Sequence, residues 1–246
     1  MTAKKPKAYI GTSGWSYNHW QGAFYPDDLP RSRYFEYYLS KFDTVEINNS
    51  FYNLPEKSTF ENWRQRSPDG FIFAVKASRY ITHMKKLKDP GKPVKTFLAN
   101  AGVLKDKQGP ILFQLPPRWH CNLERLAAFL EMLPAKNRYA FEFRDDTWWN
   151  TDVSQLLTEY EAAFGIFDLE GRQSPQEITS GDFVYVRLHG PGGAYQGLYG
   201  KRRLTAWADR ISRWLSDSRD VYCYFDNDEK GYAARDALML KGLIAS

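Results

Sequence analysis

Residues 109–143 have the sequence GPILFQLPPRWHCNLERLAAFLEMLPAKNRYAFEF, and this stretch decides the fold. Short apolar runs at 111–115 and 139–143 are typical of buried strands. Between them, apolar residues recur at intervals of three and four from Leu123 to Leu133, which places them on one face of a helix. A strand, a helix and a second strand in this order predict a right-handed βαβ unit with parallel strands.

The same alternation extends over nearly the whole chain. Strands are predicted at 9–12, 44–48, 71–76, 111–115, 139–143, 164–168, 183–189 and 221–225. Helices are predicted at 31–42, 59–66, 94–104, 123–133, 153–162, 206–215 and 232–243. Eight strands in 246 residues favour an α/β fold closed into a (β/α)8 TIM barrel over an open doubly wound sheet, because such barrels have about 250 residues.

One connection breaks the alternation. Residues 169–182 contain Gly171, Pro175 and Gly181 but little helical periodicity, so a loop is expected in place of the sixth helix. Otherwise no linker, repeat or low-complexity tract divides the chain. We therefore predict a single TIM-barrel domain over residues 1–246, with a flexible basic tail at 1–7.

Composition excludes several classes of protein. Hydrophobic residues make up 43% of the chain, which is typical of a globular domain and not of a disordered one. Cys121 and Cys223 are far apart and form no CxxC pair, which argues against a disulfide framework or a structural zinc site. No segment approaches the roughly 18 apolar residues of a membrane span, and no signal-peptide pattern is present. A soluble, cytoplasmic protein without a membrane partner is expected.

The sequence also lacks the common cofactor and metal motifs. Its histidines, His19, His83, His120 and His189, show no HExxH spacing. Ser13 lies in Gly-Thr-Ser-Gly and not in the Gly-x-Ser-x-Gly of a nucleophile elbow. The glycine-rich residues 190–197 are not a P-loop. We therefore predict no metal and no cofactor.

Polar residues alternate with apolar ones along seven of the strands and should face the barrel interior near its carboxyl end, where barrel active sites lie. The catalytic candidates are Glu46, Lys76, Glu142 and His189, and the substrate-binding candidates on or near strands are Asn48, Gln114, Arg144, Arg187 and Asn227. A barrel without function is filled there by Val, Ile and Leu. The polar ring therefore favours a functional cleft, with a self-satisfied layer of ion pairs as the alternative.

Buried charges in this ring must pair, because an isolated buried charge is costly. We expect Glu46 to pair with Lys76, and Glu142 to pair with Arg144 or Arg187. With a formal net charge of +5, the chain permits an anionic ligand, either a small molecule or nucleic acid, without demanding one.

Aromatic residues in the loops form a second candidate layer. Stacking on a sugar ring or a nucleobase is predicted for Trp15, Trp20, Tyr52, Trp148, Tyr195 and Tyr199. A plug that caps the barrel is the alternative for about half of the loop aromatics. Gly11 and Gly14 are expected to let a ligand approach the backbone closely. The glycine-rich residues 190–197 predict either an anion-binding nest or a flexible lid.

Several stretches together resemble the YecE-like family, a domain of unknown function. They are GTSGWSYNHW, DTVEINNSFYNLP, FIFAVKASRYITH, GPILFQLPP, YAFEFRDDTWW, YVRLHG and CYFDNDEKGYAARDAL. The resemblance implies a (β/α)8 barrel and supports the inward polar ring, but it brings no established reaction. Asp145 stands where this family usually has histidine, and Asp226 where it usually has asparagine, which adds negative charge. The family is also distantly similar to metal-dependent apurinic endonucleases, whose histidine-rich cluster this chain lacks.

The leading hypothesis is an enzyme acting on a phosphate- or sugar-containing substrate, with nucleotides and nucleic acid included. Glu46 or Glu142 would be the general acid or base while the other holds a cation, and His189 is a second acid–base candidate. A metal-free glycoside hydrolase using Glu46 and Glu142 is the runner-up, although nearby cations would lower both pKa values. A non-catalytic nucleic-acid-binding module is the third hypothesis.

Overall fold

The computed structural model describes residues 5–175 and 180–245. Contacts divide the chain into two units that are interleaved in sequence. Unit 1 comprises Met1–Glu46, Ile166–Gln173 and Phe183–Ser246. Unit 2 comprises Ile47–Gly165 and Ser174–Asp182. Residues 1–4 of the predicted tail and residues 176–179 of the predicted loop lie outside the described part of the chain.

In unit 1, buried strands pair in parallel. The strands are β1 (Ala8–Thr12), β9 (Asp220–Phe225) and β8 (Phe183–Leu188), which pair in that order. The second half of β6 (Ala163–Leu169) continues the order, and β7 (Arg172–Gln173) pairs antiparallel with its end. A parallel bridge also joins Ser13, just after β1, to Glu46 in β2 (Thr44–Ile47).

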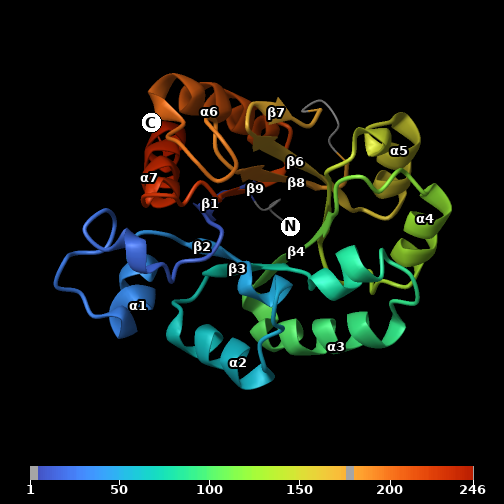
Figure 1. Cartoon of the computed structure of the whole chain (residues 1–246), viewed down its shortest axis with the longest axis horizontal. Coiled ribbons are helices and arrows are strands. Elements are labelled where there is room, and N and C mark those ends of the chain that lie inside the picture. Colours follow the sequence, from blue (N-terminus) through green and yellow to red (C-terminus); the bar gives the residue numbers. More distant parts are fainter. Residues whose placement is uncertain (1–4, 176–179, 246) are drawn as a thin grey trace. The chain divides into compact units, whose positions relative to one another are not determined.

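Helices α6 (Gly200–Ser216) and α7 (Tyr232–Ala245) lie side by side in unit 1 (Figure 1). Buried Leu204, Trp207, Ile211 and Trp214 fall on one face of α6 at three- and four-residue spacing, and α6 packs on β9. The remaining helical segments of this unit are η1 (Asn18–Trp20), η2 (Arg31–Arg33) and α1 (Tyr34–Leu39).

Unit 2 contains β3 (Ile72–Lys76), β4 (Gln108–Leu115), β5 (Tyr139–Phe143) and the start of β6, paired in parallel in that order. Its longer helices are α2 (Lys57–Arg66), α3 (Gly91–Ala101), α4 (Leu123–Glu131) and α5 (Thr151–Glu159). The shorter ones are η3 (Asn49–Phe51), the π-helix η4 (Tyr80–Met84), η5 (Gly102–Lys107) and η6 (Asp146–Trp148). Asn122 and Asn150 begin α4 and α5 by accepting backbone N–H bonds at 2.9 and 3.0 Å.

The chain has the predicted (β/α)8 TIM barrel fold. The predicted gap in the alternation is also confirmed for the described residues, because 170–175 and 180–182 form turns and the short β7 but no helix. The last residue of the expected tail is held in place. The Lys7 ammonium lies 2.8 Å from Asp43, and the Lys7 backbone N–H donates to Asp220 at 2.9 Å.

Gly11 is required by packing within unit 1. A Cβ on Gly11 would lie 2.5 Å from the backbone oxygen of Thr44, so only glycine lets the two backbones approach this closely. That Gly11 lets a ligand approach the backbone stays a prediction. In the described part of the chain, no helix has the length and apolar character needed to cross a membrane.

Candidate functional site

A buried ionic network in unit 1 is centred on Arg187. Its members, called the Arg187 network below, are Ser13, Glu46, Tyr185, Arg187, His189 and Asp226. Arg187 donates to Glu46 through Nε at 2.9 Å and through Nη2 at 2.8 Å, which is a bidentate pair. The side chains of Arg187 and Glu46 are 1% and 0% exposed. Neither charge is in contact with solvent, so each charge is stabilised by the other.

Two hydroxyl groups also donate hydrogen bonds to the Glu46 carboxylate. The Ser13 hydroxyl donates to Oε1 at 2.5 Å, and the Tyr185 hydroxyl donates to Oε2 at 2.7 Å. Burial raises the pKa of Tyr185 well above its usual value, so the phenol keeps its proton and remains a donor. With the two bonds from Arg187, each carboxylate oxygen accepts at least two hydrogen bonds. Glu46 is therefore an anchor for Arg187.

The network continues through His189 and Asp226. Arg187 Nη1 lies 3.2 Å from His189 Nε2, and His189 Nδ1 lies 3.1 Å from Asp226 Oδ2. Because a guanidinium can only donate, His189 Nε2 must accept, and the ring proton therefore sits on Nδ1 and is donated to Asp226. Asp226 also accepts from Arg187 Nη2 at 3.1 Å. His189 is 0% exposed, whereas the Asp226 side chain is 14% exposed.

Strand geometry explains how these groups meet. Tyr185, Arg187 and His189 alternate along and just after β8, so they project from one face. Asp226 follows β9, the neighbour of β8. The sequence predicted Lys76 as the partner of Glu46, and the partner found in unit 1 is Arg187, whose planar fork matches both carboxylate oxygens.

Tyr195 covers the edge of this network. Its ring meets His189 edge-on at 5.6 Å between centroids, and Tyr195 is 46% exposed. Several N–H groups of the surrounding glycine-rich loop already donate to other groups of unit 1. Gly190 donates to the Tyr199 hydroxyl at 3.1 Å, and Ala194 donates to Glu170 at 2.8 Å. N–H groups that already donate within the protein are not available to an anion, so these bonds argue against an anion-binding nest.

Three other residues of unit 1 that were predicted to bind substrate are buried. Tyr199 is buried, and its backbone N–H donates to Asp236 at 3.0 Å. Asn227 is also buried and donates to Asp236 and to the backbone oxygen of Gly197, each at 2.8 Å. Trp20 is 0% exposed within a group of aromatic rings that includes Tyr25. Trp20 Nε1 and Asn227 Oδ1 are buried and have no hydrogen-bond partner among the described residues. That Tyr199, Asn227 and Trp20 bind substrate stays a prediction.

Asp168, at the end of β6, was not among the predicted site residues. It is 3% exposed, and its Oδ2 accepts from Gln173 at 2.9 Å. Its Oδ1 is buried and has no hydrogen-bond partner among the described residues. Burial raises the pKa of this carboxyl. Its place at the end of a barrel strand was the available signal, but its burial could not be predicted from the sequence.

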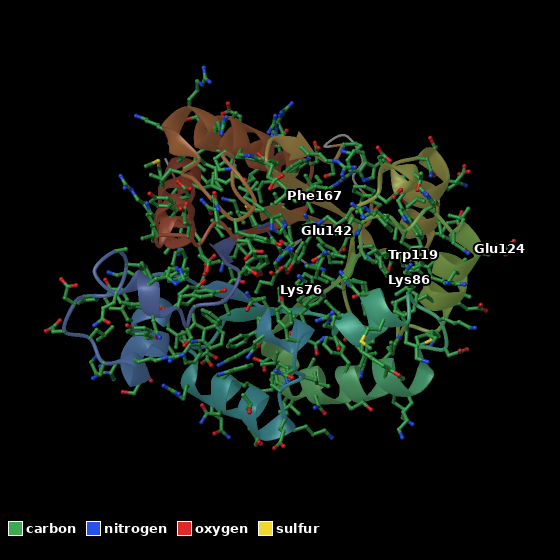
Figure 2. All side chains as sticks on the ribbon, viewed as in Figure 1. Lys76, Lys86, Trp119, Glu124, Glu142 and Phe167 are labelled. Atoms are coloured by element: carbon green, nitrogen blue, oxygen red, sulfur yellow. The ribbon has the colours of Figure 1, made fainter. Side chains whose placement is uncertain are left out.

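Unit 2 contains a second polar cluster, which includes the predicted Glu142, Arg144 and Lys76. Arg144 Nε donates to Glu142 at 2.5 Å, which confirms one of the two predicted pairings. Glu142 on β5 lies beside Gln114 of β4 in the strand register. The Lys76 ammonium lies over the Phe51 ring at 4.1 Å. Figure 2 labels Glu142 and Lys76 on their strands.

His83 belongs to the same cluster, although the sequence did not single it out. Its ring meets Phe51 edge-on at 5.0 Å, and its Nδ1 lies 2.9 Å from the Thr82 hydroxyl. Burial and then the neighbouring Lys76, Arg79 and Arg144 lower the pKa of His83 to about 4. We call Phe51, Lys76, Arg79, His83, Glu142 and Arg144 the Phe51 cluster.

The remaining predicted aromatics of the two units divide between core and surface. Trp148 is 0% exposed and stacks on Phe143 at 4.9 Å between ring centroids, and its stacking on a ligand stays a prediction. Trp15 is half-buried against Phe35. Tyr52 is 68% exposed and Asn48 is half-buried, so both keep a surface that a ligand could contact.

Unit 2 has two cavities. One, of about 450 Å³, is at the start of β5 and is lined by residues such as Leu133, Arg138 and Tyr160. The other, of about 470 Å³, lies beside η4 and α3. Among the described residues, no group of three or more His, Cys, Asp or Glu side chains could hold a metal ion. Metal independence itself stays a prediction.

Residues 9–246 match the family described as protein of unknown function DUF72. The chain belongs to the DUF72 family. It is 24% identical to the UPF0759 protein YunF of Bacillus subtilis over 96% of this chain and 94% of YunF. It is also 31% identical to the UPF0759 protein YecE of Escherichia coli K12, over 55% of this chain and 48% of YecE.

Solved structures agree with this assignment. A DUF72 protein from Thermotoga maritima is 27% identical, with a TM-score of 0.89 over 98% of this chain and all of that one. A D-psicose 3-epimerase from Clostridium cellulolyticum H10, solved with D-tagatose, has a TM-score of 0.53 at 10% identity, over 97% of this chain and 98% of the epimerase. At that identity the epimerase shows a shared fold alone. The DUF72 assignment confirms the resemblance found in the sequence, and it brings no reaction with it.

Proposed function

We propose that this DUF72 protein is an enzyme that acts on a phosphate- or sugar-containing substrate, nucleotides and nucleic acid included, by acid–base chemistry in unit 1. The observation that carries the proposal is the His189–Asp226 pair seated on Arg187. Both contacts to the Asp226 carboxylate are 3.1 Å long, and Asp226 has the exposed edge that His189 lacks. A substrate hydroxyl could therefore reach Asp226.

In this proposal Asp226 is the catalytic residue that takes a proton from a substrate hydroxyl or from water. His189 and Arg187 are positioning residues, because each donates to the carboxylate and fixes its orientation. Glu46 acts one step further away by holding Arg187. The exposed ring of Tyr195, next to His189, provides a surface on which a sugar or base could stack.

Stability alone does not account for such a network. Replacing a buried ion pair by well-packed apolar residues is often neutral or stabilising, by about 1–4 kcal/mol. The interior of a barrel is normally filled by branched apolar residues. The two carboxylates, the guanidinium and the imidazole gathered near the ends of β8 and β9 therefore favour a functional role.

The proposal is tested by turnover. The purified full chain is incubated with sugar phosphates, nucleotides, single-stranded DNA and p-nitrophenyl glycosides, with added divalent metals and then with EDTA, and products are followed by mass spectrometry. Asp226→Asn should lower the rate about 10²- to 10⁴-fold, which is the usual contribution of a general acid or base. Asp209→Asn, at an exposed position of α6, is the matched control and should not change it.

Two outcomes would overturn the proposal. Binding of DNA or nucleotides without turnover under any condition would make the protein a binding module. Glycoside hydrolysis that is lost in Glu46→Gln and Glu142→Gln but retained in Asp226→Asn would replace the proposed chemistry by that of a two-carboxylate glycosidase.

We also propose that the protein works in the cytoplasm. Support comes from Cys121 and Cys223, which are both free thiols. Fractionation of cells that carry an epitope-tagged chain tests this location, and recovery in a membrane or extracellular fraction would contradict it.

A further inference from the structure

One segment of unit 2 is strongly basic. Residues 79–95 have the sequence RYITHMKKLKDPGKPVK, which contains six basic residues and one acidic residue, Asp89. The formal net charge of this segment, +5, equals that of the whole chain, so the remaining residues together are formally neutral. Among the described residues, none of the five lysines in the segment forms an ion pair with a carboxylate. The segment should therefore attract an anionic partner.

The lysines in the middle of this segment lie on a hydrogen-bonded turn. Leu87 is 2% exposed, and its N–H donates to the backbone oxygen of Ile81 at 3.0 Å. The Lys88 N–H donates to the backbone oxygen of Lys85 at 2.9 Å. Because Leu87 is buried, Lys86 and Lys88 on either side of it are exposed, and Figure 2 labels Lys86. Lys86 and Leu87 have φ of 46° and 62°, a conformation that is uncommon outside glycine and is concentrated at functional sites.

The same segment lines the cavity of about 470 Å³ beside η4 and α3. Ligand pockets in proteins have volumes of about 300–1,000 Å³. The apolar part of the lining includes Leu54, Ile81 and Phe97. Tyr80 also lines the cavity and is 42% exposed, so its ring is accessible from solvent. An accessible aromatic ring at an apolar hollow is suited to stacking on a flat ring.

Positive charge lies next to this ring. Lys85 and Lys92 line the cavity together with Asp89, and the Lys85 ammonium lies 5.9 Å from the centre of the Tyr80 ring. The other cavity of unit 2, of about 450 Å³, has more carboxylates in its lining. Its charged residues are Lys136, Arg138, Glu159, Glu161 and Asp182. Two cavities of similar volume therefore differ in the sign of the ligand that their charges favour.

We propose that residues 79–95 and the cavity beside them, called the Tyr80 surface below, bind single-stranded nucleic acid. One base would enter the cavity and stack on Tyr80, and the neighbouring phosphates would contact the lysines of residues 85–92. A run of cations matches a chain of phosphates better than it matches one carboxylate. A single strand fits better than a duplex, because its bases are free to leave the stack. The Tyr80 surface requires no turnover and so goes beyond the function proposed above.

The test is fluorescence anisotropy of the full chain with a fluorescein-labelled oligothymidylate of about 15 nucleotides, a length that covers one site of this kind. Affinity should fall as NaCl rises, with a log–log slope of about −3 if four lysines contact phosphates. The duplex of the same length should bind more weakly. Vesicles of phosphatidylserine and phosphatidylcholine, which also present many anionic groups, should not bind at the same salt concentration.

Two matched pairs of variants locate the binding. Tyr80→Ala should weaken oligothymidylate binding about 5- to 100-fold, because a base loses its stacking partner. Tyr160→Ala, which removes a ring that is 40% exposed in the other cavity, should not change it. Lys92→Gln should reduce the size of the salt slope by about 0.7, whereas Lys136→Gln, exposed in the other cavity, should leave the slope unchanged.

Three results would overturn the Tyr80 surface. They are equal affinity of the parent chain and Tyr80→Ala, an unchanged salt slope in Lys92→Gln, and tighter binding to the vesicles than to the oligonucleotide. If Tyr80→Ala does not fold, the parent chain is cross-linked by light to a strand that contains 4-thiothymidine. Mass spectrometry should then find the adduct within residues 79–97, and an adduct found only outside this range would overturn the proposal.

The Tyr80 surface and the proposed enzyme fail separately. Asp226→Asn should bind the oligothymidylate as tightly as the parent chain does. Binding that depends on Tyr80 in a protein without turnover would keep the surface and remove the enzyme. Turnover that depends on Asp226, in a chain whose affinity for the oligonucleotide ignores Tyr80→Ala, would keep the enzyme and remove the surface.

Discussion

Removing Arg187 should destabilise the protein strongly. Arg187→Met keeps much of the side-chain volume. Within the part of the chain that the structure describes, it leaves Glu46, which is 0% exposed, with only its hydroxyl partners Ser13 and Tyr185. Removing one partner of a buried pair costs about 3–5 kcal/mol, because the other charge stays buried without compensation. For a chain of this length, 1 kcal/mol changes Tm by about 2–4 °C, so Tm should fall by about 6–20 °C.

Urea unfolding of a double-mutant cycle measures this effect. Glu46→Gln leaves Arg187 its contact with Asp226 at 3.1 Å, so it should cost less, about 1.5–3 kcal/mol. The double variant Glu46→Gln, Arg187→Met no longer buries an unpaired carboxylate. Its loss should therefore be smaller than the sum of the two single losses by at least about 1 kcal/mol.

The control is an exposed ion pair with a similar distance between its charged atoms. Arg138 Nη2 lies 2.7 Å from Asp182, but these side chains are 35% and 61% exposed. Solvent screens such a pair, so Arg138→Met should cost less than about 1 kcal/mol. A loss below about 1 kcal/mol for Arg187→Met, or strict additivity in the cycle, would refute the conclusion that the network is held together by this pair.

Three further predictions follow from single residues. Gly190 has φ +119°, and a Cβ there would overlap the Gln196 backbone oxygen, so Gly190→Ala should cost about 2 kcal/mol or more in urea unfolding. A thiol reagent should label the partly exposed Cys121 in the folded chain but reach the buried Cys223, whose thiol pKa burial raises, only after denaturation; equal labelling rates would contradict this. Because burial raises the pKa of Asp168, its charged form is disfavoured on folding, and Asp168→Asn should be at least as stable as the parent at pH 7. That advantage should shrink toward about pH 4, where the parent gains stability by protonation; a growing gap in acid unfolding curves would contradict it.

The strands were predictable because their signal is local. Short apolar runs bounded by turns lie at every strand of the barrel, and β5 (Tyr139–Phe143) has the predicted bounds. Helix ends were less accurate. For example, α6 begins at Gly200, well before the predicted 206, because the polar residues of its first turns carry little hydrophobic periodicity.

The partners within the site were harder to predict, because pairing depends on three-dimensional reach. The pairing of Glu142 with Arg144 follows from their i, i+2 positions, with Glu142 on β5 and Arg144 just after its end. The pairing of Glu46 with Arg187 joins residues 141 positions apart, and nothing in the sequence distinguishes it from Glu46 with Lys76. His83 was missed for a related reason. A π-helical turn places it beside Phe51, and such a turn has no periodic sequence signal.

The sequence left open whether Asp226 would favour a neutral ligand over an anionic one. In the Arg187 network, Asp226 accepts from Arg187 at 3.1 Å, lies 3.1 Å from His189 Nδ1 and keeps a 14% exposed edge. A carboxylate accepts hydrogen bonds but cannot donate them, and a second anion placed against it would be repelled. The exposed edge of Asp226 therefore suits a hydroxyl group of a ligand, which can donate to it, better than a phosphate oxygen, which cannot.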